Sequence, residues 1–160
     1  MNNQKNISFM KEAIESANEG LLRKSGGPFG AVIVKDNKVI GKGYNKVIED
    51  NDPSAHAEIV AIRNACSTIK SFDLTGAELY TTCFPCPMCA TAILWSRLTK
   101  VHYCLTSEDA AKIGFDDKCF YNKMGDKKFW KDFAIKDDKH LKDCVELFSA
   151  WFNDETKTMY

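Results

Sequence analysis

The stretch Pro85-Cys86-Pro87-Met88-Cys89 decides the fold of this 160-residue chain, together with His56-Ala57-Glu58, which precedes it. Each stretch opens a segment in which apolar residues recur at helical spacing, so a helix is predicted to begin at each of them. The N-termini of both helices would then point at one spot, where unsatisfied backbone amides and the helix dipoles favour negative charge. One imidazole, two thiols and one carboxylate are therefore expected to meet there.

Apolar periodicity extends this pattern in both directions along the chain. Helices are predicted over 8–22, from 52 or 54 to 69, over 87–95, from 107 to Gly114 and over 141–152, and strands over 31–34, 38–41, 78–82 and 100–105. The mixed-charge stretch 116–143 lacks a clean period and predicts short helices and loops, with a candidate edge strand at 129–136. Beyond the first hairpin, strands and helices alternate. This order predicts a three-layer α/β/α fold, with one mixed sheet flanked by helices, in a single domain over 1–160.

Composition narrows the class of protein. The chain has 22 basic and 22 acidic residues, and this balance argues against nucleic acid as a partner. No stretch is long and apolar enough for a transmembrane helix, and the polar start lacks the apolar core of a signal peptide, so the cytoplasm is the expected location. The cysteine count of seven is odd, which favours reduced thiols, some of them on a metal, over a disulfide framework.

The two stretches also match a chemical signature. The pattern H-x-E followed by P-C-x-x-C is typical of zinc-dependent nucleobase deaminases. His56, Cys86 and Cys89 are the predicted zinc ligands, and three protein ligands leave the fourth position for water. Glu58 is predicted to stay off the metal and move protons, first from water to a ring nitrogen and then to the departing ammonia. One Zn²⁺ is expected per subunit.

Other interpretations compete with this one. Cys83 could complete a closed structural zinc site with the same ligands, and Cys86 with Cys89 could form a thioredoxin-type redox pair. Neither interpretation gives Glu58 a role. The remaining cysteines show no ligand spacing and are expected to be buried small apolar residues: Cys66, Cys104, Cys119 and Cys144. His102 is expected to be a satisfied core or surface residue, and His140 to be solvated.

Beyond the zinc motifs, nearly the whole chain resembles the small bacterial guanine deaminases of the cytidine deaminase superfamily. The residues that carry the likeness are 26–36, 51–66, 79–81 and 109–117. The resemblance implies attack at C2 of guanine, with xanthine and ammonia as products, in purine catabolism or salvage. It also implies that Asn45 hydrogen-bonds the purine edge, that Asp117 accepts from a purine N–H, that Phe29 and Trp95 border the base, and that Ala57 belongs to the substrate site. From the sequence alone, Asn45 is equally explained as a turn residue and Asp117 as a loop or cap residue. Phe29 and Trp95 are equally explained as core aromatics.

The resemblance further implies a homodimer whose subunits exchange their C-terminal segments, about residues 141–160. Tyr160 of one subunit would then close the pocket of the other. Relatives usually carry glutamate directly before the Pro-Cys pair, where this chain has Phe84, a residue that could add an apolar wall to the pocket. Cytosine or cytidine, guanosine and a tRNA adenosine remain alternative substrates to guanine, and a zinc-stabilised binding module remains the non-enzymatic alternative.

Overall fold

The structure is a computed structural model that describes residues 2–159, with side chains described from residue 8 onward. Contacts within the chain group into two units, Met1–Lys118 and Cys119–Tyr160. The first unit contains the sheet and both metal-binding stretches, and the second contains the C-terminal helices. A single domain over 1–160 therefore stays a prediction.

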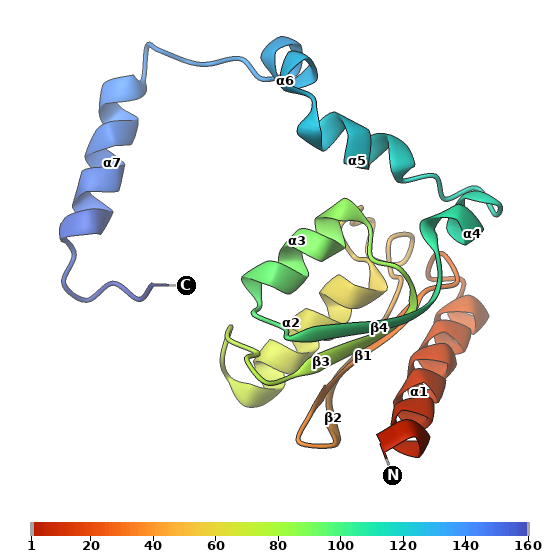
Figure 1. Cartoon of the computed structure of the whole chain (residues 1–160). Coiled ribbons are helices and arrows are strands. Elements are labelled where there is room, and N and C mark those ends of the chain that lie inside the picture. The colour runs from red at the N-terminus through yellow and green to blue at the C-terminus, as the bar shows by residue number, and fades with distance from the viewer. Residues whose placement is uncertain (1, 160) are drawn as a thin grey trace. The chain divides into compact units, whose positions relative to one another are not determined.

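The first unit is a three-layer α/β/α arrangement. Its elements are α1 (Asn2–Arg23), β1 (Gly30–Lys35), β2 (Lys38–Tyr44), α2 (Ala57–Ile69), β3 (Glu78–Cys83), α3 (Pro87–Trp95), β4 (Lys100–Leu105) and α4 (Ser107–Ala111). The sheet order is β2-β1-β3-β4, in which β1 is antiparallel to both of its neighbours and β3 is parallel to β4. Helix α1 covers one face of the sheet, and α2 and α3 cover the other (Figure 1). The predicted layers and the mixed sheet are confirmed.

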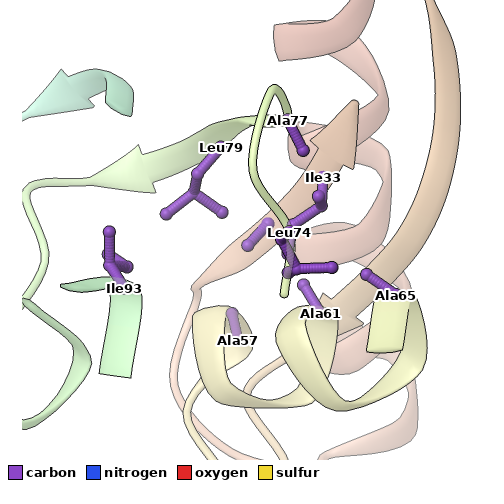
Figure 2. Close-up of a cluster of buried hydrophobic side chains, with 9 residues drawn as sticks. Ile33, Ala57, Ala61, Ala65, Leu74, Ala77, Leu79 and Ile93 are labelled. Atoms are coloured by element: carbon purple, nitrogen blue, oxygen red, sulfur yellow. The ribbon is translucent and has the colours of Figure 1, made fainter. Parts of the chain in front are cut away.

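The core is divided by the alternation of side chains along β1. Ala31 and Ile33 point to one face and pack with apolar residues of α2 and α3 (Figure 2). Val32 and Val34 point to the other face, where they pack with Ala13 of α1. Because both faces are covered, β1 is an almost continuous run of small and β-branched apolar residues rather than an alternating one.

Helix α2 lies unusually close to strand β2. A Cβ atom at Gly43 would lie 2.4 Å from the carbonyl oxygen of Ala57, and one at Gly41 would lie 2.4 Å from that of Ala61. Only glycine allows this approach of backbone to backbone, and the alanines of α2 supply the matching flat surface. The first turn of α2, which carries His56 and Glu58, is thereby held directly against the end of β2.

Two predicted helix starts differ in the structure. Helix α1 begins at Asn2 rather than at residue 8. Helix α2 begins at Ala57 with His56 as its N-cap, whereas the sequence predicted Asp52 or Ser54 as the cap. The side chain of Asp52 accepts hydrogen bonds from the amide and hydroxyl of Ser54, and this local turn competes with a helix.

The second unit holds α5 (Lys118–Gly125, which begins on the last residue of the first unit), α6 (Lys127–Phe133) and α7 (Leu141–Asn153). The predicted final helix is confirmed, but the edge strand predicted at 129–136 is wrong. Asp126 caps α6 by accepting from the amides of Lys128 and Phe129, and Phe129 stacks on Phe133 one helical turn away. Among residues 2–159, no helix is long and apolar enough to cross a membrane.

Candidate active site

The candidate site lies at one edge of the sheet. Strands β2, β3 and β4 all run in the same direction, because β1 is antiparallel to both β2 and β3. Their C-terminal ends and the start of β1 therefore meet at this edge, and open α/β sheets bind ligands outside the carboxyl ends of their strands. Asn45 follows β2, Cys86 follows β3 and Asp117 follows β4 with the short helix α4 between them.

Two of the predicted ligands are N-cap residues. His56 precedes α2 with φ −68° and ψ 156°, and Cys86 precedes α3 with φ −65° and ψ 168°. Neither side chain makes a capping hydrogen bond, so both are available for another partner. Pro87 at the start of α3 provides the φ that a first helical turn needs, and Cys89 lies in this first turn.

The three donor atoms have the spacing of a zinc site. His56 Nδ1 lies 3.5 Å from Cys86 Sγ and 3.6 Å from Cys89 Sγ, and all three donor atoms lie within 4.8 Å of one another. Zn–N and Zn–S bonds at tetrahedral angles place a nitrogen and a sulfur ligand about 3.5 Å apart. The donor set therefore fits a tetrahedral zinc ion with its fourth position left to a non-protein ligand.

The competing interpretations of the cysteines find no support here. Cys83 does not join the donor set, since its Sγ donates to the carbonyl oxygen of Thr106 at 3.4 Å. Burial and the nearby carboxylates raise the pKa of Cys83 to about 11, which keeps it a thiol. Cys86 and Cys89 are both free thiols, and both contact His56, a residue that a redox pair does not need.

The other cysteines and histidines are placed as follows. The prediction of burial is wrong for Cys104, Cys119 and Cys144, which are exposed, and Cys66 is only half-buried. Cys104 lies on the edge strand β4, and the helices that carry Cys119 and Cys144 have no buried residues. His102 is confirmed as a satisfied residue, bonded to Glu78 at 2.8 Å and stacked on Tyr80. His140 is exposed and pairs with Asp137.

Glu58 is buried beside the donor set. Its side chain is 6% exposed, and its Oε2 accepts a hydrogen bond from Cys89 Sγ at 3.5 Å. Burial raises the pKa of Glu58. Hydrogen bonds from Cys89 and His56 lower the pKa of Cys86 to about 4, so a thiolate forms readily at the start of α3. The hydrogen bond to Cys86 raises the pKa of His56.

A cavity of about 610 Å³ adjoins this site, a volume that suits a small molecule. Its lining residues come from the end of α1, the loop before β1, the segment after β2 and the loop after α4: Leu21, Lys24, Gly26, Gly27, Pro28, Asn45, Val47, Ile48, Pro53, His56 and Phe115. Because His56 belongs to both groups of residues, the cavity opens directly beside the metal ligands.

Asn45 is fixed in the wall of the cavity. It is buried, and its Oδ1 accepts a hydrogen bond from the amide of Val47 at 3.2 Å. A Cβ atom at Gly26 would lie 2.0 Å from this Oδ1, so glycine is required for the observed orientation. The bond to Val47 leaves Nδ2, which has no hydrogen-bond partner among the residues that the structure describes, as a donor at the cavity.

Asp117 carries an unsatisfied buried acceptor. Its Oδ1 is buried without a hydrogen-bond partner in the described part of the chain. Burial and the negative charge of Cys86 raise the pKa of Asp117, and His56 also interacts with this carboxylate. An orphaned buried acceptor is costly, and it therefore marks a position where a ligand that donates a hydrogen bond would be stabilised.

The other predicted residues are placed differently. Phe29 is half-buried in the core, where its ring meets the edge of Phe115, a cavity residue that the sequence analysis did not single out. Ala57 is fully buried at the start of α2. Trp95 is exposed at the far end of α3, about 13 Å of helix rise from Cys86, and is not a lining residue.

Two more predictions concern the rim of the site. Phe84 is 43% exposed and makes an edge contact with the ring of Tyr103 on β4, and it does not line the cavity. An apolar wall from Phe84 is therefore not part of this pocket. Tyr160 lies outside the described residues.

Known proteins share these features. Residues 3–105 match the model of the cytidine and deoxycytidylate deaminase zinc-binding region. The guanine deaminase of Bacillus subtilis (strain 168) is 42% identical over 156 residues, which are 96% of this chain and 97% of that protein. The X-ray structure of guanine deaminase from Bacillus subtilis matches with a TM-score of 0.88, again over 96% and 97% of the two chains.

A second group of relatives is named for deamination of adenosine in tRNA. A tRNA-specific adenosine deaminase of Buchnera aphidicola subsp. Schizaphis graminum is 37% identical over 130 residues, which are 80% of this chain and 82% of that protein. The family match, the near full-length relative and the tetrahedral donor set agree with one another. This chain belongs to the cytidine and deoxycytidylate deaminase family of zinc-dependent enzymes.

Proposed function

We propose that this chain is a guanine deaminase, which hydrolyses guanine to xanthine and ammonia. The observation that carries the proposal is the tetrahedral spacing of His56, Cys86 and Cys89, with the buried carboxylate of Glu58 in contact with the set. Similarity to a guanine deaminase over 96% of the chain supports the choice of substrate.

The residues of this chain have distinct tasks in that reaction. Zinc held by His56, Cys86 and Cys89 supplies a Lewis acid that lowers the pKa of a water molecule to about 7. Glu58 accepts a proton from the attacking water and passes it to N3, the unprotonated ring nitrogen beside C2, which makes C2 electrophilic. Glu58 then delivers the second proton to the amino group, which leaves as ammonia while C2 gains the oxygen. Its burial excludes bulk water, so the proton passes between Glu58 and substrate rather than to solvent.

Recognition of a purine needs both a donor and an acceptor at the cavity. Asn45 offers Nδ2 as a donor to an acceptor on the purine edge, because its Oδ1 is already bonded to Val47. Asp117 is not among the lining residues of the cavity, but it interacts with His56, which is, and it offers the orphaned Oδ1 to a purine N–H. The backbone amide of Ala57 lies in the first turn of α2, where helix amides lack intrahelical partners, and it can donate to the substrate.

Deamination of a tRNA adenosine is the second candidate, supported by the Buchnera relative. The formal net charge of zero opposes it, since a tRNA-binding surface usually carries a basic excess. The two candidates differ at ring nitrogen N1, which is next to the amino-bearing carbon in both bases. Guanine carries an N–H at N1 for Asp117 to bind, whereas N1 of adenine is unprotonated.

The proposal includes a homodimer with exchanged C-terminal segments and one zinc per subunit. Helix α7 supports the exchange, because it has no buried residues and leaves an apolar stripe exposed at positions 141, 145, 148 and 152. Leu94 and Trp95 at the end of α3 are also exposed. A second copy would cover these surfaces, and Tyr160 would reach the partner's cavity. A cytoplasmic place in purine breakdown or salvage completes the proposal.

An ammonia-release screen tests the proposal on the zinc-loaded protein. Guanine, guanosine, cytosine, cytidine, adenine and tRNA are compared at equal concentration, and guanine is expected to give the fastest release. Glu58→Ala should abolish release while retaining zinc, whereas Glu19→Gln on the exposed face of α1 should change neither. A folded, zinc-loaded chain that releases no ammonia from any of these compounds would instead be a zinc-stabilised binding module.

A further inference from the structure

Phe115 is the one aromatic residue among the residues that line the cavity, and no motif predicted it. It lies two residues before Asp117, in the loop that follows α4. The residue is 43% exposed. Three observations describe how this ring is held.

The backbone at Phe115 is fixed by the end of α4. Gly114 adopts φ +94°, a left-handed conformation that favours glycine. The amide of Phe115 donates to the carbonyl of Ala110 at 3.1 Å, and the amide of Gly114 donates to that of Ala111 at 3.0 Å. This pair of bonds is the Schellman motif, in which the residue after the left-handed glycine commonly makes an apolar contact.

The ring of Phe115 is held by the loop before β1. It meets Phe29 edge-on, with ring centroids 4.9 Å apart and an interplanar angle of 87°. A Cβ atom at Gly27 would lie 2.7 Å from Phe115 and 2.8 Å from Phe29, so both rings press against the bare backbone of this glycine. Aromatic edge contacts of this kind stabilise beyond the apolar area that they bury.

The same loop also holds Asn45. The amide of Asn45 donates to the carbonyl of Phe29 at 3.0 Å, and Gly26 fits against the Asn45 side chain. Phe29 therefore contacts Asn45 directly, and it also contacts Phe115, which precedes Asp117 by two residues. Oδ1 of Asp117 has no hydrogen-bond partner among the described residues, and the carboxyl group has a backbone hydrogen bond at Asp117 itself, so its position depends on the neighbouring backbone.

We infer that Phe115 is a positioning residue, which docks on Phe29 and Gly27 and thereby holds the carboxylate of Asp117 where it receives the purine N–H. The inference rests on the proposed function, because it assigns the substrate contact to Asp117. It adds a specificity determinant that lies outside the zinc ligands and outside the hydrogen-bonding residues themselves.

A double-mutant cycle on substrate binding tests this role. Phe115→Ala, Asp117→Asn and the double variant are made in a Glu58→Ala background, in which bound guanine is not consumed. Equilibrium dialysis with labelled guanine gives the Kd of each. Loss of a hydrogen bond to a charged group weakens binding by about 10- to 100-fold, and Asp117→Asn is expected in that range. Phe115→Ala should weaken guanine binding by a similar factor. The double variant should bind guanine less tightly than Asp117→Asn by less than about threefold, since the effects of coupled residues are not additive.

Controls separate positioning from loss of fold. Phe72→Ala removes a ring of similar exposure, 46%, that does not line the cavity, and it should leave the Kd unchanged. Phe115→Leu keeps apolar volume without an aromatic edge, and is the variant to use if Phe115→Ala melts below the Phe72→Ala control. Additive losses in the cycle, or an unchanged Kd in Phe115→Leu and Phe115→Ala, would overturn the inference. Failure of the wild-type protein to release ammonia from guanine would instead reject the proposed function, so the two failures are distinguishable.

Discussion

Addition of one methyl group at Gly43 should damage both the stability and the chemistry of this protein. In Gly43→Ala the new Cβ would lie 2.4 Å from the carbonyl oxygen of Ala57 and 2.5 Å from the amide nitrogen of Ala61, whereas ordinary contacts begin at 3.4 Å. Both atoms are backbone, so no side chain can rotate away. Helix α2 must therefore move by about 1 Å relative to β2, because close-packed interiors have no free space to absorb the contact.

The size of the effect follows from that shift. Overpacking of a core contact costs about 1–3 kcal/mol of unfolding free energy. For a chain of this length each kcal/mol lowers Tm by about 2–4 °C, which gives a fall of roughly 2–12 °C. The shift also carries His56 and Glu58, at the start of α2, away from Cys86 and Cys89 on α3. A displacement of about 1 Å at a reacting group can lower the rate about 100-fold.

Calorimetry and ammonia release from guanine measure the two effects in the same preparations. Gly125→Ala is the matched control, because a Cβ there meets nothing within 4 Å, and alanine in a helix is expected to be neutral or slightly stabilising. Zinc content per chain should fall in Gly43→Ala and stay constant in the control. If Gly43→Ala keeps the wild-type Tm, zinc content and rate, then α2 is not fixed by this contact and the reasoning is refuted.

Three further outcomes are expected. Gly26→Ala should raise KM for guanine about 10-fold with little change in zinc content, because the new Cβ displaces Asn45 Oδ1 and costs about one hydrogen bond. Steady-state kinetics measure this, and an unchanged KM would contradict it. Removal of zinc with a chelator should stop ammonia release and lower Tm, and added Zn²⁺ should restore both. Full activity in protein that holds less than one metal ion per chain would exclude the assigned site. The hydrogen bond from His102 lowers the pKa of Glu78 in the folded state below its ordinary value of 4.5. The pair therefore stabilises the folded state fully at a pH above 4.5, and this stabilisation is lost as the pH falls through the lowered pKa of the folded state. Urea unfolding should therefore find Glu78→Gln destabilised at about pH 7 but not at about pH 3, and an equal loss at both pH values would argue against the pair.

Much of the fold could be predicted because it is encoded locally. Apolar spacing identified each strand of the sheet to within a few residues, and also the helices around it, although α1 begins well before the predicted residue 8. The strand predicted from the aromatic-rich stretch at 129–136 is wrong, because its β propensity was overridden by the Asp126 cap and by stacking of Phe129 on Phe133. The predicted start of α2 failed for a similar reason, since Asp52 and Ser54 form a turn of their own.

The candidate site could be predicted only in part. The zinc ligands and Glu58 belong to compact motifs, in which two or three neighbouring positions carry the whole signal. Phe115 and Gly27 carry no such signal, because their contact joins segments from opposite ends of the unit and depends on the left-handed backbone of Gly114. A phenylalanine directly after a helix-ending glycine was the sequence feature available, and it is too common to indicate a pocket wall. Trp95 lies at the end of α3 and is not among the residues that line the cavity, so its place beside the base stays a prediction.

The proposed site draws on segments within and after the stretch that matches the family. The family match covers 3–105 and ends with β4. It therefore contains the proposed zinc ligands and Glu58, but stops before Phe115 and Asp117. Those two residues follow β4, and the parallel direction of β3 and β4 brings them to the edge where Cys86 lies. Asn45 lies within the match, so the segment after β4 is expected to supply one part of substrate choice, and its replacement should leave the metal chemistry intact. On that reasoning, variants in 106–117 should alter the ranking of guanine against the other bases without altering zinc content, whereas variants of the ligands should lower turnover of every base alike.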